Sequence, residues 1–243
     1  MFRFASLIAF VLLSTLAFAE EAPKPNAPEE PKDMKPLFKD ISAWEGDMRM
    51  WSLKDGVMRG QTTKEIVAKG NTFLVLKDTV LKDFELRISF RIEAGNSGIQ
   101  YRSAVAPAKP DAENKWVVRG YQAEVENTPG KVGFLYHEGG RGWICDVGNK
   151  VEIGEDAKPK VVGKIGDNKA LGATYKKGDW NDYIIIAKGN HIVHYLNGYQ
   201  TIDVIDNDPK NRLMEGILAL QIHAGPPMVV EFKDARLKLH DAK

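Results

Sequence analysis

Residues 183–205 are YIIIAKGNHIVHYLNGYQTIDVI, three apolar runs separated by the dipeptides Gly189-Asn190 and Asn197-Gly198. Asn-Gly is the strongest short-range signal for a β-hairpin, because the favoured two-residue turn needs a positive φ at both central positions. The stretch therefore predicts three consecutive antiparallel strands joined by tight turns.

A period-two alternation of apolar and polar residues dominates the rest of the chain, and helical periodicity is nearly absent. Turn dipeptides recur at short intervals, as at Asp55-Gly56 and Pro129-Gly130. This spacing predicts a single all-β domain, a two-sheet antiparallel β-sandwich of the concanavalin-like jelly-roll type, with six or seven strands in each sheet. The residues expected in its core include Leu86, Ile88, Phe90, Leu218, Leu220 and Ile222. A loop over 104–119 is expected to overhang one face.

Residues 1–19 have the features of a secretory signal peptide. Arg3 precedes an apolar run of about a dozen residues, and Ala17-Phe18-Ala19 is a small-x-small cleavage pattern. The run is too short to span a membrane, which takes about 20 residues, and no Cys follows the cleavage pattern to carry a lipid anchor. We expect cleavage between Ala19 and Glu20, and a secreted or periplasmic protein without a membrane anchor.

The remaining chain divides into a linker and one domain. Residues 20–35 are rich in Pro, Glu and Lys and predict a flexible linker, and residues 36–243 are expected to form the sandwich. Loss of Arg3 lowers the formal net charge from +1 to 0, and no basic block indicates a nucleic-acid partner. Cys145 is the only cysteine, which excludes a disulfide framework and predicts a small buried residue.

Three predicted strands place unusual polar side chains on one face. Amides, carboxylates and Arg make directional hydrogen bonds to sugar hydroxyls, and Arg adds a rigid fork that Lys lacks. A solvated outer face would explain any one of these strands alone. Three strands that carry Gln but no Lys at these positions favour a carbohydrate site. The strands contribute Gln100 and Arg102, then Gln122, Glu124 and Glu126, and finally Gln221 and His223.

The sequence defines no cofactor and no metal-ligand set. His191 and His194 lie three apart on one predicted strand, so they face opposite sides and make a poor joint metal site. The acidic stretch DVIDNDPKN, residues 203–211, could hold a divalent cation such as Ca²⁺, although a run of this kind is usually a turn.

Five stretches, in order, resemble the 3-keto-disaccharide hydrolase domain family: GNSGIQYRS, GYQAEVEN, GFLYHEGGRGW, GDWNDYIIIAKGNHIVHYLNG and LALQIHAGPPMVVEFKDARLK. The resemblance extends over residues 36–239 without large gaps. It implies a concanavalin-like jelly roll that cleaves glycosides already oxidised to a ketone at C3 of a sugar ring. The expected partner is therefore a saccharide oxidised at C3.

Cleavage of such a substrate requires a base and a group that holds the C3 oxygen. The ketone acidifies the proton on C2, so a base can remove this proton and expel the oxygen on C1, and water then adds to the product. The two candidates for the base are His223 and Glu124. We favour His223, because an unperturbed imidazole has a pKa of about 6.5, with Glu124 orienting it or binding a hydroxyl; Glu124 would need its pKa raised by burial to act as the base. Arg102 is expected near the C3 oxygen. The predicted substrate contacts are Gln100, Gln122, Glu126 and Gln221, with a rim of Tyr136, His137, Arg141 and Trp143.

Two other functions fit parts of the pattern. The strand Gln122-x-Glu124-x-Glu126 is similar to the E-x-D-x-E strand of laminarinase-type glucanases, whose first carboxylate is the nucleophile. Gln122 cannot form the glycosyl-enzyme ester, which disfavours a retaining glycosidase. A lectin-like module that binds sugar without cleaving it would use the same kinds of side chain.

Overall fold

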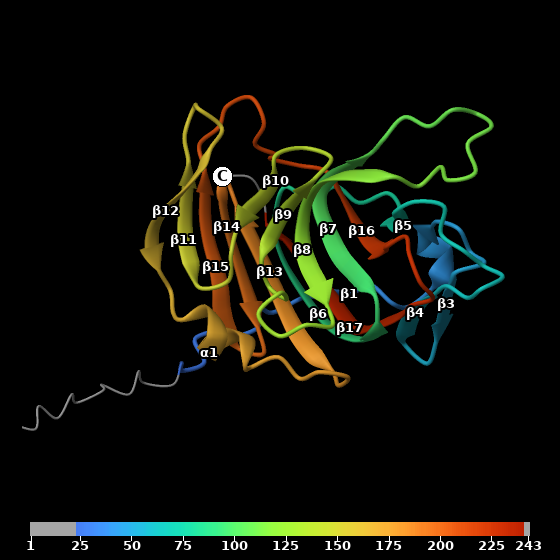
Figure 1. Cartoon of the computed structure of the whole chain (residues 1–243), viewed down its shortest axis with the longest axis horizontal. Coiled ribbons are helices and arrows are strands. Elements are labelled where there is room, and N and C mark those ends of the chain that lie inside the picture. Colours follow the sequence, from blue (N-terminus) through green and yellow to red (C-terminus); the bar gives the residue numbers. More distant parts are fainter. Residues whose placement is uncertain (1–22, 241–243) are drawn as a thin grey trace, which may run out of the picture.

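The computed structural model describes residues 23–240, so the predicted signal peptide and the first residues of the linker lie outside the described residues. Within that range the regular secondary structure is almost entirely β, with one short helix, α1 (Asn168–Gly172), and one 3-10 turn, η1 (Ile41–Ala43). The strands form two sheets packed face to face, which confirms the predicted sandwich (Figure 1). No helix of residues 23–240 is long and apolar enough to cross a membrane.

One sheet has ten strands and the other has seven. In spatial order the ten-stranded sheet contains β12 (Pro159–Lys164), β11 (Asn149–Ile153), β15 (Tyr199–Asp206), β14 (His191–Leu196), β13 (Asn181–Lys188), β6 (Asp83–Ala94), β17 (Val229–His240), β4 (Val57–Gln61) and β3 (Trp51–Lys54), with β1 (Lys35–Pro36) paired to β17. The seven-stranded sheet contains β10 (Gly142–Cys145), β9 (Leu135–Glu138), β8 (Val118–Glu126), β7 (Asn96–Val105), β16 (Ile217–Ile222), β5 (Thr72–Leu76) and β2 (Trp44–Glu45). The first sheet is larger than predicted because short edge strands extend it.

The predicted hairpins of residues 183–205 are present. β13 pairs with β14 and β14 with β15, both antiparallel. Asn197 and Gly198 have φ values of 51° and 88°, as a tight turn with two left-handed central residues requires. The sequence signal and the structure agree here because turn geometry depends only on neighbouring residues.

The inward faces of the two sheets share one apolar core. Leu86, Phe90 and Leu220 are fully buried there, and the other three predicted core residues are buried as well. Burial of a side chain of this size stabilises the fold by about 1.5–3 kcal/mol. Cys145 is also buried, and burial raises the pKa of its thiol to about 12, which keeps the thiol protonated.

The described part of the predicted flexible linker is attached to the domain. The backbone N–H of Asn26 donates to Gly198 O at 2.8 Å, and Glu30 forms an ion pair with Arg236 of β17, also at 2.8 Å. Polar groups of this segment thus find partners on the ten-stranded sheet, so its composition alone did not predict its attachment.

The loop between β7 and β8, residues 106–117, passes across the outer side of the seven-stranded sheet. It projects from the ends of both strands (green, Figure 1), and Trp116 O accepts a 3.0 Å hydrogen bond from Phe73 N of β5. Because β16 lies between β7 and β5, the loop must cross β16 to reach that partner. Ala219, on the outer side of β16, is accordingly fully buried. The predicted overhanging loop is confirmed.

Candidate carbohydrate site

Polar side chains gather on the outward side of the seven-stranded sheet, where β8, β7 and β16 are neighbours. Gln100 pairs directly with Gln122, and Gly98 pairs with Glu124. Continuing the register between β16 and β7 places Gln221 beside Gly98. The predicted proximity of the three glutamines and Glu124 is therefore confirmed, whereas the roles of these residues stay predictions. We call this surface the polar face, and it holds Gln100, Gln122, Glu124 and Gln221.

A chain of hydrogen bonds runs along the polar face toward Glu124. Ser103 Oγ donates to Gln100 Oε1, Gln100 Nε2 to Gln122 Oε1, and Gln122 Nε2 to Glu124 Oε2, each at 2.8 Å. Asn96 Nδ2 donates to the other carboxylate oxygen. An ionised carboxylate only accepts hydrogen bonds, so it sets the orientation of every amide in the chain.

Glu124 is a buried carboxyl group with a raised pKa. Its side chain is 5% exposed, and this burial raises its pKa to about 7. The hydrogen bonds from Gln122 and Asn96 oppose the rise, whereas the nearby charges of Glu126 and Glu138 add to it. A base whose pKa lies near the working pH is partly ionised and still basic enough to take a proton efficiently. Glu124 therefore has the properties of a general base.

Gly98 allows the side chain of Gln122 to lie across β7. A Cβ at position 98 would be 2.3 Å from Gln122 Cδ and 2.5 Å from its Cγ, closer than atoms can approach. A glycine inside a strand weakens the strand and often marks a close approach of another group. At this position it lets Gln122 extend over the neighbouring strand and reach Glu124.

His223 lies on the wall of a cavity near the Glu124 carboxyl group. The cavity has a volume of about 440 Å³, and Asn96 contributes to its wall as well as donating to Glu124. His223 is exposed, and its Nδ1 lies 2.6 Å from Ala224 O. A carbonyl oxygen only accepts, so Nδ1 carries the proton and the neutral ring leaves Nε2 as an acceptor. The lining residues are Gly95, Asn96, Glu126, His223, Ala224, Gly225, Pro226 and Met228.

Asn96 and Glu138 belong to this region but were not predicted. Asn96 lies four residues before Gln100 on β7, and Glu138 lies two residues after Tyr136 on β9, so alternation alone indicates their outward direction. Burial raises the pKa of Glu138, and the nearby charge of His223 lowers it. The carboxyl groups and the imidazole are thus within electrostatic range of one another.

Arg102 is not on the polar face, which corrects its predicted place beside Gln100. The register shifts just after Tyr101, and Arg102 has a φ of 47°, so the alternation of the strand is broken there. The guanidinium is fully buried and connects the two sheets at one end. It donates to Lys82 O at 2.7 Å, to Gly189 O at 2.6 Å and to Asp83 Oδ1 at 3.1 Å.

His137 and Arg141 are not on the predicted rim either. His137 pairs with Tyr121, whose side chain is in the core, and burial together with the charge of Arg141 lowers the pKa of His137 to about 4. Arg141 donates to His137 Nδ1 at 3.2 Å and forms ion pairs with Asp206 and Asp208. Two of the three carboxylates suggested for Ca²⁺ thus form ion pairs with Arg141, whereas the third, Asp203, lies 2.8 Å from His191 Nε2. Within residues 23–240 no group of three or more His, Cys, Asp or Glu side chains is arranged to hold a metal ion.

Tyr136 and Trp143 lie beside the polar face, as the rim prediction requires. Tyr136 pairs with Gln122 on one side and with Trp143 on the other. The Trp143 ring stacks on Phe134 with centroids 4.0 Å apart, donates from Nε1 to Asp146 at 2.8 Å, and is 50% exposed. An indole held in this way offers a flat apolar surface at the edge of the site.

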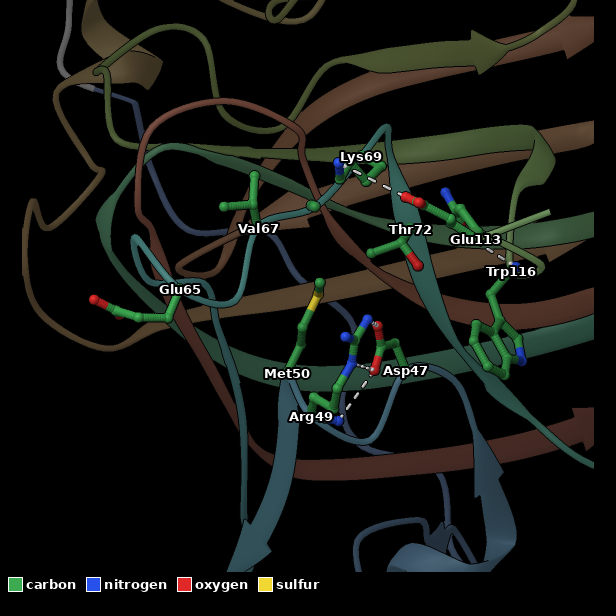
Figure 2. Close-up of a pocket in the computed structure, with 11 residues that line it drawn as sticks. Asp47, Arg49, Met50, Glu65, Val67, Lys69, Thr72, Glu113 and Trp116 are labelled. Carbon is green, nitrogen blue, oxygen red and sulfur yellow. Dashed lines mark hydrogen bonds and ion pairs between the residues drawn. The ribbon is translucent and has the colours of Figure 1, made fainter. Parts of the chain in front are cut away.

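A larger cavity, of about 550 Å³, lies at the β5–β2 end of the same sheet (Figure 2). Figure 2 shows Trp116 next to Thr72 on one side and the bidentate ion pair of Arg49 with Asp47 on another. Its lining combines one aromatic ring with charged and amide groups, a mixture suited to a sugar. The remaining lining residues are Met50, Glu65, Val67, Ala68, Lys69, Glu113 and Asn114.

Asn71 connects this cavity to the segment that carries His223. Asn71 O accepts from Asn114 Nδ2 at 2.9 Å, and Asn71 Oδ1 accepts from Ala224 N at 3.1 Å. The two cavities therefore lie on either side of one hydrogen-bonded residue, which links the overhanging loop to the end of β16.

The model of the 3-keto-alpha-glucoside-1,2-lyase-like domain family matches residues 33–238, which include every strand of the sandwich except the last two residues of β17. The chain belongs to this family. No curated protein matches it. As a member of the 3-keto-alpha-glucoside-1,2-lyase-like family, the chain has a carbohydrate-related fold of the type found in glycosyl hydrolases and carbohydrate-binding modules.

Solved structures share the jelly roll of this 3-keto-alpha-glucoside-1,2-lyase-like domain. One is a "Putative glycosyl hydrolase" of Parabacteroides distasonis, at 19% identity and a TM-score of 0.53, covering 85% of this chain and 99% of that one. Another is a Bacillus subtilis protein of unknown function with a galectin-like fold, at 10% identity and a TM-score of 0.52, covering 88% of this chain and 97% of that one. At these identities the likeness shows the fold alone.

Proposed function

We propose that this protein cleaves 3-keto-glycosides, with Glu124 as the base that removes the proton from C2. The observation that carries the proposal is the Glu124 carboxyl group on the outward face, which is 5% exposed, has a raised pKa and is held by two amide donors. A carbon-bound proton next to a ketone needs such a base, whereas a retaining glycosidase needs a second carboxylate as nucleophile. Gln122 occupies the position of that nucleophile.

The reaction would proceed through an enolate. Glu124 takes the C2 proton, and the electron pair of the C2–H bond moves toward the C3 oxygen. The enolate then re-forms the ketone, makes the C1–C2 double bond and breaks the bond from C1 to the glycosidic oxygen. Addition of water across the double bond completes hydrolysis.

His223 is assigned to the leaving group rather than to C2. Its Nδ1 donates to Ala224 O, and in the imidazolium form its Nε2–H can give a proton to the departing oxygen, leaving the neutral ring. The exposed position of the ring suits a group that exchanges protons with water. This assignment reverses the roles that the sequence suggested, because burial gives Glu124 the basicity that an ordinary carboxylate lacks.

We assign the larger cavity, with Trp116, to the leaving sugar.

The test compares a 3-keto-glycoside with the same glycoside before oxidation. We expect the purified protein to release the leaving group from the first and to leave the second intact, and to exchange the C2 proton with deuterium from D2O. Binding without turnover would favour a lectin-like module, and turnover of the unoxidised glycoside would favour an ordinary glycosidase. Either result would overturn the proposal.

Two variants separate the roles of the base and the acid. Glu124→Gln should lose both C2 exchange and cleavage at every pH. His223→Gln should keep C2 exchange, should lose cleavage of an ordinary alkyl glycoside, and should regain it with a p-nitrophenyl leaving group, which needs no proton. Loss of C2 exchange in His223→Gln with retention in Glu124→Gln would return the role of base to His223.

We also propose that the protein is exported. N-terminal sequencing of the mature protein tests this proposal, and the expected first residue is Glu20.

A further inference from the structure

Gln221 differs from the other glutamines of the polar face because its amide is unpaired. Its Nε2 and Oε1 are both buried, and neither has a hydrogen-bond partner in the described part of the chain. Gln100 and Gln122 each use both amide atoms in the chain that ends at Glu124. A buried polar group without a partner destabilises a fold, so this amide calls for a functional explanation.

Gln221 and Glu124 lie on opposite sides of Gly98. Glu124 pairs with Gly98 from β8, and the register of β16 places Gln221 on the other side. Neighbouring strands are about 4.8 Å apart, so the two backbones are separated by about 10 Å. Gln122 covers the glycine between them. A sugar ring that lies on Gln122 would have the carboxyl group at one edge and the unpaired amide at the opposite edge.

We infer that Gln221 binds the hydroxyketone of the substrate, with Nε2 donating to the C3 oxygen and Oε1 accepting from the C4 hydroxyl. A primary amide holds a donor and an acceptor side by side, and a ketone with a neighbouring hydroxyl has the complementary pair. Because Glu124 removes the C2 proton, C2 lies toward β8 and C4 lies toward β16. The inference rests on the proposed function and narrows the substrate class to 3-keto-glycosides with a free C4 hydroxyl.

The Nε2 donor would assist the chemical step as well as binding. Negative charge develops on the C3 oxygen as the C2 proton leaves, and a hydrogen bond to a charged acceptor is stronger than one to a neutral ketone. An interaction that strengthens in the transition state raises kcat rather than only lowering KM. Gln221 thus takes the place that the sequence suggested for Arg102.

Both amide atoms of Gln221 are buried, so a sugar can reach them only when the loop 106–117 moves away from β16. The loop 106–117 crosses β16 and is fastened at its far end by few contacts. These are the bond from Phe73 N to Trp116 O, the bond from Asn114 to Asn71 O, and an exposed ion pair of Lys69 with Glu113 at 3.8 Å. Such a segment can lift without disturbing the sheet beneath it.

Gln221→Leu tests the inference through stability and activity together. The variant should have a higher Tm than the wild type, by about 4 °C, because it removes two unpaired buried polar atoms. The matched variant Gln100→Leu should have a lower Tm, because it leaves the buried Gln122 Oε1 without a donor. On a 3-keto-glycoside, Gln221→Leu should lose at least about 100-fold in kcat/KM, the usual effect of removing an oxyanion donor. A lower Tm for Gln221→Leu, or activity within tenfold of wild type, overturns the inference.

A second substrate tests the contact with C4. The wild type should cleave a 4-deoxy-3-keto-glycoside at least about tenfold less efficiently than the parent compound, because Gln221 Oε1 then lacks its donor. Gln221→Leu should treat the two compounds alike. Equal rates in the wild type overturn the inference while leaving the proposed function intact. Failure of the wild type on the parent compound overturns the proposed function itself, so the two failures are distinguishable.

Discussion

Replacing Asn96 with alanine should shift the pH dependence of turnover to higher pH. Its only described side-chain hydrogen bond goes to Glu124, and that bond lowers the pKa of the carboxyl group. A hydrogen bond to a charged group contributes about 1.5–3 kcal/mol, and one pKa unit corresponds to about 1.4 kcal/mol. Asn96 is only partly buried, so water replaces some of the lost interaction. We therefore expect the pKa of Glu124 to rise by about one unit, from about 7 to about 8.

The assay is kcat/KM on a 3-keto-glycoside between pH 5 and pH 10. The ionised fraction of Glu124 at pH 7 would fall from about one half to about one tenth, so Asn96→Ala should be about fivefold slower there and nearly equal to the wild type at pH 9. Asn190→Ala, in a turn of the ten-stranded sheet, is the matched control and should not shift the profile. An unshifted acid limb in Asn96→Ala would refute Glu124 as the base.

Four further substitutions or conditions test other parts of the structure. Gly98→Ala should lower kcat/KM at least about tenfold and reduce the free energy of unfolding by about 1–3 kcal/mol, since its Cβ would overlap Gln122; unchanged activity and urea midpoint would contradict this packing. Arg102→Met should reduce the free energy of unfolding by about 3–5 kcal/mol while KM stays constant, and a raised KM at normal stability would restore a substrate role. Burial lowers the pKa of His194 to about 3, so below pH 6.5 the unfolded chain binds a proton that the native state excludes. The free energy of unfolding should therefore fall as the pH drops from 6.5 toward 3. Measured by urea denaturation, the free energy of unfolding of His194→Gln should depend less on pH over this range. Trp116→Ala should raise KM for a 3-keto-disaccharide more than for a 3-keto methyl glycoside, and equal effects would argue against a leaving-sugar cavity.

Local patterns in the sequence were sufficient for the strands, the turns and the shared face of the glutamines. Alternation fixes the side to which a strand residue points, so Gln122, Glu124 and Gln221 were correctly placed on one outward face. The same rule places the side chains of the adjacent residues Tyr136 and His137 on opposite sides of β9, so alternation alone excludes a rim that contains both. The Asn197-Gly198 turn was predictable because its geometry depends on two adjacent residues.

The tertiary structure decided what depends on contacts between distant segments. A bulge after Tyr101 turns Arg102 into the space between the sheets, and no feature of the strand sequence marks that shift. The raised pKa of Glu124 comes from burial, which requires the neighbouring strands and their side chains to be in place. Likewise, the unpaired amide of Gln221 exists only because the register of β16 leaves it beside a glycine. In the regular parts of the strands, the sequence determined which side chains face outward, because alternation is a property of each strand. Bulges, register and burial determined which of those side chains can act, because they are properties of the assembled sheets.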